Sequence, residues 1–157
     1  MCLGIALSKG ELPEELIWRH GLYRRIHKRS ENRPEVRFLY WDRRPRLPIV
    51  RDGRLQIVRW GNGHGQSRYL PRTGWTWIET IEAGGWRNLP AMPVEIPATY
   101  ALERRGVWYL VERGVRGLLV PDERGIAVAY MVCEPSTHYY RIMTGSERMP
   151  TLIEQRI

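Results

Sequence analysis

The sequence predicts an α+β fold: a single strand-rich domain with a curved, barrel-like sheet and a few flanking helices. Three observations support this class. The chain has 157 residues, 43% of them hydrophobic, which is enough for one sizeable buried core. Its C-terminal half holds β-branched and aromatic runs separated by short turn segments. Its N-terminal part has one segment with helical periodicity.

The predicted helix covers Glu11–Lys28. Apolar residues recur there at three- and four-residue spacings, acidic residues open the segment and basic residues close it, as a helix dipole favours. Gly21 weakens the pattern in its middle. The Arg- and Pro-rich run that follows, Arg29–Pro48, is expected to be extended and irregular.

A tight hairpin is predicted at Asp52-Gly53, the two-residue turn between the expected strands Leu47–Arg51 and Arg54–Trp60. The Gly-rich stretch Gly61–Gly74 is expected to be an exposed loop that borders a site. No strand-to-helix fingerprint follows its glycines, which argues against a dinucleotide site. Glu79–Trp86 is predicted as a short helix.

Three later strands are predicted from β-branched and aromatic runs. They cover Val107–Glu112, Arg116–Val120 and Ile126–Cys133, and the turn segments Arg113-Gly114 and Pro121–Gly125 separate them. Short strands at this spacing favour a curved sheet within one domain, residues 1–157.

Composition excludes several classes of protein. No apolar run approaches the roughly 18 residues of a membrane span, and the first ten residues lack the pattern of a signal peptide. We therefore expect a cytoplasmic protein with no membrane association. Cys2 and Cys133 cannot form a disulfide framework and lack the spacing of a zinc site, so neither a metal nor another cofactor is expected.

Positive charge is concentrated in one part of the chain. Between Arg19 and Arg72, fourteen Arg and one Lys stand against four acidic residues, a local net charge of +11 where the whole chain carries +8. Arginine pairs with phosphate in bidentate fashion and stacks on bases. Tryptophans lie in or beside this stretch, a composition typical of a groove for single-stranded nucleic acid. A merely solvated basic surface is the alternative.

Cys2 follows the initiator Met1 and is the residue with the most distinctive chemistry. Removal of Met1 would leave a free α-amine and a thiol on adjacent carbons. An α-amine titrates near pH 7.7 to 8, so part of it is nucleophilic at neutral pH and attacks aldehydes. The thiol can then close a five-membered thiazolidine on the imine carbon. A second-position cysteine can also be an accident of sequence.

The order of several motifs resembles the SOS response-associated peptidase family, whose members cap abasic sites in single-stranded DNA. The similar segments span almost the entire chain: Met1–Leu7, Pro45–Leu55 with Arg59-Trp60-Gly61, Ile78–Ile81, Ile96-Pro97-Ala98 with Leu102-Glu103, and Glu147–Pro150. The resemblance implies the family's fold, its covalent capture of abasic sites through Cys2 and its self-processing or peptidase activity. It also implies Glu103 as the acidic residue that moves protons.

Three site positions depart from the family pattern. Trp75 stands where the family has Asn, which helps to hold the N-terminal amine; Ser146 stands where it has the proton-handling His; and Gly4 replaces an Arg. A serine hydroxyl cannot shuttle protons near neutral pH, so His138 is the nearest candidate for that role, with an ordinary surface histidine as the alternative.

Five residues are the DNA-binding candidates. Arg148 is expected to contact phosphate or brace the site, Trp60 and Trp75 to stack on bases unless they are core residues, and Arg37 and Arg59 belong to the basic stretch.

Three hypotheses follow. The first is single-stranded DNA binding with covalent capture of abasic sites by Cys2. The second is a non-catalytic module that binds nucleic acid or a phage or host protein. The third, a thiol hydrolase with a Cys/His pair, is the weakest, because no local motif surrounds either cysteine.

Overall fold

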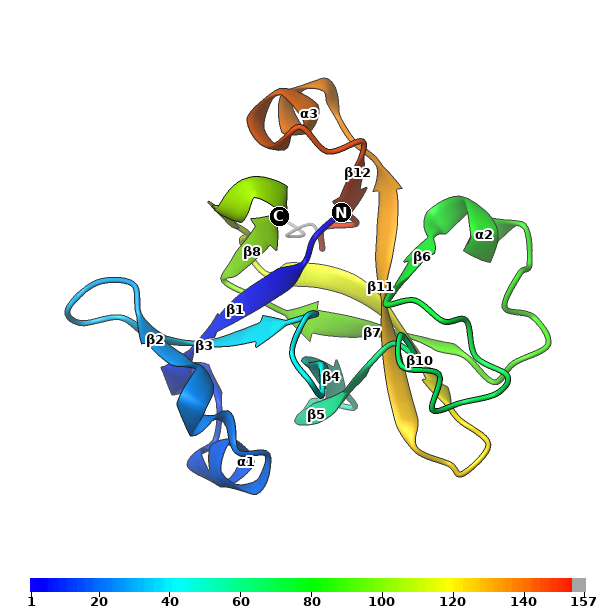
Figure 1. The fold of residues 1–157 in the computed structure, drawn as a ribbon, viewed down its shortest axis with the longest axis horizontal. Helices are drawn as coiled ribbons and strands as arrows, with labels where there is room; N and C mark the ends of the chain where they lie inside the picture. Colours follow the sequence, from blue (N-terminus) through cyan, green and yellow to red (C-terminus); the bar gives the residue numbers. More distant parts are fainter. Residues whose placement is uncertain (154–157) are drawn as a thin grey trace.

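Five strands close into a barrel at the centre of the structure, a computed structural model that describes residues 1–153. The strand order is β10-β7-β4-β5-β11, and β11 pairs back with β10, so the ring is complete. Neighbours are antiparallel except β5 and β11, which are parallel. The strands are β4 (Arg46–Arg51), β5 (Arg54–Trp60), β7 (Met92–Pro97), β10 (Gly114–Pro121) and β11 (Ala127–Pro135). The predicted α+β class and barrel-like sheet are confirmed (Figure 1).

The barrel is filled by apolar side chains from its own strands. Leu47, Ile49, Ile96, Val115 and Met131 are fully buried, as the alternation of inward and outward residues in a small barrel requires. Two short strands, β6 (Trp75–Trp77) and β12 (Arg148–Pro150), pair with β11 beyond the ring. β11 is therefore the strand that joins the barrel to the site described below.

A second sheet holds the start of the chain. Its order is β2-β3-β1-β8-β9, and β1 is antiparallel to both of its neighbours. The strands are β1 (Gly4–Ser8), β2 (Ile26–Lys28), β3 (Pro34–Leu39), β8 (Tyr100–Glu103) and β9 (Val107–Leu110). Because β1 is a central strand, the N-terminus is fixed beside the end of β8 and near β12 (Figure 1).

The helices are short and lie outside the barrel. They are α1 (Glu14–Arg19), α2 (Ile78–Glu82) and α3 (His138–Thr144), with 3-10 turns η1 (Lys9–Glu11), η2 (Leu22–Arg25) and η3 (Arg104–Gly106). Within residues 1–153, no helix is long and apolar enough to cross a bilayer.

The single helix predicted over Glu11–Lys28 is wrong, because the chain breaks where Gly21 adopts a left-handed φ of 63°. Three residues of the predicted helix, Ile26–Lys28, instead pair with β3 as strand β2, so sheet hydrogen bonds override helical periodicity. The run expected to be irregular contains β3. The predicted helix Glu79–Trp86 is shorter than expected and ends before Gly84, whose φ is 80°.

The predicted hairpin and later strands are confirmed. Asp52 and Gly53 both have positive φ, 51° and 74°, as the tight turn between β4 and β5 requires. Strands β9, β10 and β11 lie where the β-branched runs predicted them, with boundaries shifted by a few residues.

The rings of Tyr40, Trp60 and Trp75 lie between the N-terminal site and a basic cavity, both described below. We call these three rings the aromatic wall. Tyr40 lies 5.2 Å from Trp60 and 4.4 Å from Trp75, and the two indoles are 6.0 Å apart, between ring centroids. The Trp60 indole donates to the carbonyl of Gly74 at 2.9 Å, which ties the end of the Gly-rich loop to the wall. The N-terminal site borders Trp75, and a basic cavity borders Trp60.

Candidate functional site

The N-terminal amine lies on a buried carboxylate. The Met1 nitrogen is 3.0 Å from Oε1 and 3.1 Å from Oε2 of Glu103, whose side chain is 0% exposed at the end of β8. The same nitrogen donates to the hydroxyl of Ser146 at 2.6 Å, and that hydroxyl donates to the carbonyl of Arg148 at 2.9 Å. Three segments far apart in the sequence therefore meet at one amine.

Glu103 depends on this amine for its counter-charge. Among residues 1–153 the Met1 ammonium is the only cation paired with Glu103. A buried carboxylate without a partner is strongly unfavourable, because desolvation is not offset by attraction to an opposite charge. The site therefore favours a positively charged or proton-donating group at the start of the chain.

Cys2 is adjacent to the amine but is not activated in this state. Its side chain is fully buried, and the thiol donates to the carbonyl of Gly4 at 3.1 Å. Burial raises the pKa of the Cys2 thiol to about 12, so the thiol is neutral at physiological pH. A nucleophilic cysteine usually has the opposite surroundings, electropositive and partly exposed. This environment gives no support to a thiol hydrolase.

Trp75 contacts the same segment. Its indole nitrogen donates to the carbonyl of Cys2 at 2.9 Å. β6 carries Trp75 and pairs in parallel with β11, which positions the half-buried indole over the N-terminal residues. The structure thus brings Trp75, Glu103 and Ser146 together around Met1 and Cys2, although two of these residues differ from the family pattern.

Two tyrosines, the buried Tyr140 and the partly buried Tyr109, extend the polar network. The hydroxyls of Tyr109, in β9, and Tyr140, in α3, are 2.9 Å apart. Burial is the main cause that raises the pKa of both phenols, and the nearby Glu103 raises both further. Both phenols are therefore neutral at physiological pH, near the carboxylate. Sequence reasoning missed both tyrosines, because no motif or spacing links a strand residue to a helix residue 31 positions later.

An aromatic cleft opens beside Met1. Its volume is about 480 Å³, and Trp75, Trp77, Trp86 and Tyr69 line it together with Met1. Tyr69 is 74% exposed, so the cleft has an accessible aromatic rim. Planar groups of a ligand can stack on such surfaces.

Arg148 lies at the edge of this cleft. Its guanidinium is 4.6 Å from the Trp77 ring centroid and donates to both carboxylate oxygens of Glu79, at 3.0 and 2.8 Å. This ion pair joins two of the segments that resemble the family, one in α2 and one in β12. Arg148 braces the cleft through these contacts.

For two candidate residues the structure favours the alternative that the sequence left open. Trp60 is 0% exposed and is a core residue, so it offers no stacking surface in this structure. His138 is exposed at the start of α3, and within the described part of the chain its side chain has no hydrogen-bond or ion-pair partner. The surface alternative therefore describes His138, and Ser146 and the tyrosine pair occupy the surroundings of the amine instead.

The two remaining arginine candidates lie apart from the amine. Arg37 in β3 shares the carboxylate of Glu35 with Arg29, and its guanidinium lies 4.8 Å from the Trp108 ring centroid. Arg59 in β5 pairs with Asp122 at 3.3 Å, at the basic cavity. The predicted DNA-binding residues are thus distributed over three places.

Comparisons with known proteins assign no function to this chain, so the proposal below is based on the contacts within the site. No protein-family model matches the chain, no curated protein matches it, and no solved structure matches it.

Proposed function

We propose that this protein binds single-stranded DNA and, after removal of Met1, joins Cys2 covalently to abasic sites as a thiazolidine. The proposal assigns the chain an SOS response-associated peptidase-like fold, with self-processing at the same terminus. One observation carries it: the N-terminal amine lies 3.0 and 3.1 Å from the oxygens of fully buried Glu103. A carboxylate kept beside the start of the chain suits proton transfer to and from an amine-derived adduct.

The reaction balances without an added oxidant or reductant. The amine nitrogen of Cys2 adds to the aldehyde carbon C1′ of the opened sugar, and the resulting carbinolamine loses water to form an imine. Glu103 takes the proton released by the nitrogen and gives it to the departing hydroxyl. The Cys2 sulfur then bonds to the imine carbon while the thiol proton moves to nitrogen, which closes the ring.

Met1 occupies the position that the substrate needs. It lines the aromatic cleft, and its amine takes up the hydrogen-bonding capacity of Glu103 and Ser146. Removal of Met1 would free that space and shift the charged amine by one residue, about 3.8 Å along the chain. The vacated volume beside Trp75 and Trp77 would accommodate the sugar, and the aromatic rim would hold a neighbouring base.

A catalytically inactive binding module is the second candidate. The raised pKa and full burial of the Cys2 thiol favour it, because both oppose attack by sulfur. Ser146 in place of a histidine favours it as well. When the module's partner is nucleic acid rather than a protein, the two candidates share DNA binding and differ only in the covalent step.

Intact-mass spectrometry separates them. A preparation whose chain starts at Cys2 is mixed with single-stranded DNA that carries one abasic site, then denatured. The first candidate predicts a mass gain of the oligonucleotide minus one water. A Cys133→Ala variant is the matched control, because it removes the other buried thiol and should form the same adduct.

A Cys2→Ala variant identifies the role of each atom. It keeps the α-amine, so it should form an imine that borohydride traps, yet no adduct that survives denaturation without reduction. DNA binding by the parent protein without an adduct would establish the module. Absence of salt-sensitive binding would contradict both candidates, since phosphate contacts by many arginines respond steeply to ionic strength.

A further inference from the structure

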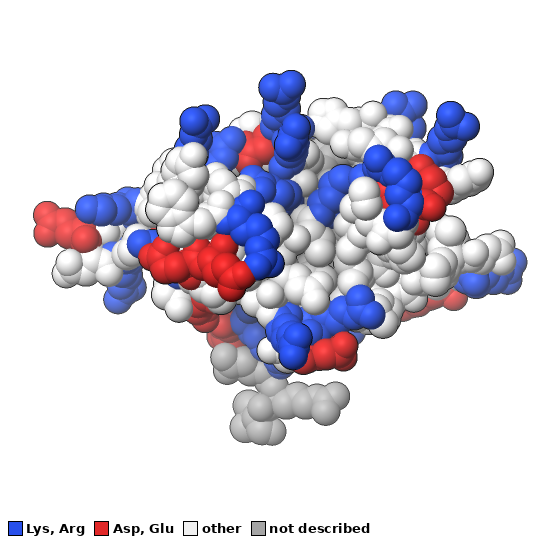
Figure 2. Space-filling model, turned by 90° about the horizontal axis from the view of Figure 1, so that it is seen from below, with Lys and Arg blue, Asp and Glu red and all other residues white. Residues whose placement is uncertain are grey.

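A second cavity lies on the Trp60 side of the aromatic wall. It has a volume of about 660 Å³ and opens between the end of α1, strands β4 and β5, the Gly-rich loop and the β10–β11 turn. Figure 2 views the molecule from this side, and Lys and Arg side chains surround the hollow in the middle of the face. Pro45, Ile57, Val58 and Ile126 provide its apolar lining.

The polar lining of this cavity is entirely basic or neutral. Arg44, Arg46, Arg59 and Arg124 contribute to it, and among the residues that the structure describes no Asp or Glu side chain lines it. Arg46 donates to the carbonyl of His20, which fixes its guanidinium at the mouth. Burial and the charge of Arg46 lower the pKa of His20, so this histidine is neutral and the arginines supply the charge.

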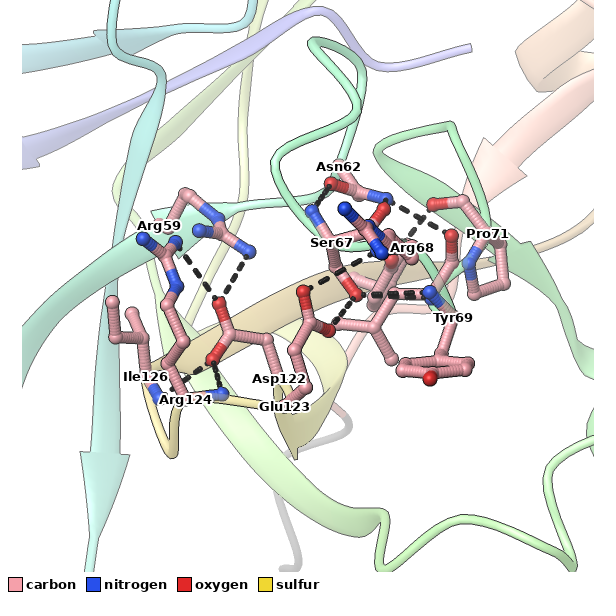
Figure 3. A network of polar contacts seen from close by, with 12 residues as sticks. Arg59, Asn62, Ser67, Arg68, Tyr69, Pro71, Asp122, Glu123, Arg124 and Ile126 are labelled. Atoms are coloured by element: carbon pink, nitrogen blue, oxygen red, sulfur yellow. Dashed lines mark hydrogen bonds and ion pairs between the residues drawn. The ribbon is translucent and has the colours of Figure 1, made fainter.

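One carboxylate beneath the lining holds two of the arginines. Figure 3 shows Asp122 in the β10–β11 turn, where Oδ1 accepts the amides of Arg124 and Ile126, both at 2.9 Å. Its Oδ2 is 3.3 Å from the Arg59 guanidinium and 3.4 Å from that of Arg124. Because the Asp122 side chain is 0% exposed, the carboxylate anchors both guanidiniums from below and does not compete for a ligand in the cavity.

The positive charge here is not fully compensated. Two guanidiniums share one oxygen of Asp122, and within the described chain Arg44 has no acidic partner. The Nε of Arg59 is buried without a hydrogen-bond partner, again among residues 1–153. A buried donor without an acceptor is rare in folded proteins. An anion with several acceptor oxygens would balance the excess charge of the arginines that line the cavity.

We propose that this cavity binds a phosphate ester, with Arg59 and Arg124 contacting the phosphate oxygens and Arg44 and Arg46 completing the site at its mouth. The planar guanidinium fork matches phosphate geometry better than it matches a single-atom anion. The apolar lining accommodates the organic part of the ester. The phosphate comes either from a free nucleotide or from the backbone of a bound strand, and the site does not involve Cys2.

Calorimetric titration at constant ionic strength tests this site. The probes are inorganic phosphate, thymidine 5′-monophosphate and an oligothymidylate without abasic sites. The variant is Arg44→Gln with Arg124→Gln, two exposed positions whose replacement leaves the core intact. Arg113→Gln is the matched control, because it removes an equally exposed arginine from an ion pair with Glu95 outside the cavity.

We expect saturable binding of at least one ester, with affinity reduced at least tenfold in the double variant and less than twofold in the control. Tight binding of the mononucleotide identifies a free nucleotide as the source, and binding of the oligonucleotide alone identifies the strand backbone. No saturable binding, or equal losses in both variants, overturns the proposal. The Cys2→Ala variant should bind all three probes like the parent, so failure of the covalent chemistry would leave this result unchanged.

Discussion

The N-terminal site and the basic cavity each contain a buried carboxylate, and the negative charge of that carboxylate is balanced differently in the two places. Each has a carboxylate with 0% side-chain exposure beneath it, Glu103 in one and Asp122 in the other. Glu103 is neutralised by an amine that belongs to the first residue of the chain. Asp122 is held by two guanidiniums and two backbone amides, all from residues inside the chain.

This difference matches the two proposals, covalent chemistry at the N-terminal site and phosphate binding in the basic cavity. The charge of Glu103 is balanced by the terminal amine, so its partner changes when the terminal residue changes. Asp122 is overcompensated, and the excess positive charge faces the cavity. We therefore assign the proposed chemistry to the carboxylate whose partner can be exchanged, and the proposed recognition to the carboxylate with more than one cationic partner.

The largest expected effect concerns Glu103. In a chain that starts at Cys2, Glu103→Gln should slow formation of the abasic-site adduct by about 10²- to 10³-fold, because general acid-base catalysis contributes on this order. Affinity for undamaged single-stranded DNA should change less than about twofold. Quenched time courses by gel measure the rate, with Glu95→Gln, an exposed strand residue, as control. Equal rates in both variants would remove Glu103 from the chemistry.

Asp122→Asn should have the next largest effect, on stability. It leaves the guanidinium of Arg59, which is only 16% exposed, without its carboxylate, and we expect a loss of about 3 kcal/mol in the free energy of unfolding. Urea denaturation measures it. Asp52→Asn, at a 91% exposed turn residue, should cost less than about 0.5 kcal/mol.

The contribution of Asp122 to the stability of the fold should also depend on pH. Burial alone would raise the pKa of Asp122, but amide hydrogen bonds from Ile126 and Arg124 and the charge of Arg59 outweigh it and hold the pKa below its usual value. A lowered folded-state pKa stabilises the fold above the unfolded pKa of about 3.9, and that contribution disappears as the pH falls below it. Asp122→Asn should therefore flatten the stability profile below about pH 4, and an unchanged profile would contradict this origin.

Two glycine substitutions test how tightly the Gly-rich loop packs beside the aromatic wall. A Cβ at Gly61, whose φ is 65°, would collide with the carbonyl oxygen of Thr73, whereas a Cβ at Gly53, with φ 74°, meets nothing within 4 Å. Gly53→Ala should cost about 1 kcal/mol for the left-handed backbone alone, and Gly61→Ala about 2 to 3 kcal/mol. Thermal unfolding compares them. Similar losses would mean that the loop moves freely against the wall.

The smallest expected effect concerns Trp75. Trp75→Phe keeps most of the ring but removes the hydrogen bond to the Cys2 carbonyl, which should cost about 1 kcal/mol. Trp77→Phe is the matched control, because among the described residues the Trp77 indole nitrogen has no hydrogen bond. Trp77→Phe should reduce the free energy of unfolding by about half as much as Trp75→Phe does. Faster hydrogen exchange at the N-terminal residues in Trp75→Phe alone would confirm the role of the indole.

Local patterns predicted the elements that depend on local chemistry. The Asp52-Gly53 turn has the positive φ angles that its residue types favour, and the β-branched runs form strands. The helix over Glu11–Lys28 failed because residues 26–28 gain hydrogen bonds from β3, a partner that periodicity cannot detect.

The same distinction applies to the site. Motif order singled out Glu103 and the position of Ser146, which meet at the amine. Trp60 has the composition of a stacking residue, but the barrel buries it. Tyr140 gains its role from a contact with Tyr109 in β9, which is distant in the sequence. Asp122 bonds its near neighbours Arg124 and Ile126, but its pairing with Arg59 in β5 cannot be predicted from the local sequence.

The central position of β1 has a consequence for the removal of Met1 that the proposed function requires. Hydrogen bonds to Leu102 and Tyr40 fix the chain from Leu3 onward, so the folded terminus has almost no slack to enter an aminopeptidase. β8 is synthesised about 100 residues after β1, roughly 5 to 20 s later at ordinary elongation rates. The proposed chemistry would require methionine excision to be completed on the nascent chain within that interval, and slower excision would leave two populations, one that starts at Cys2 and one that keeps Met1.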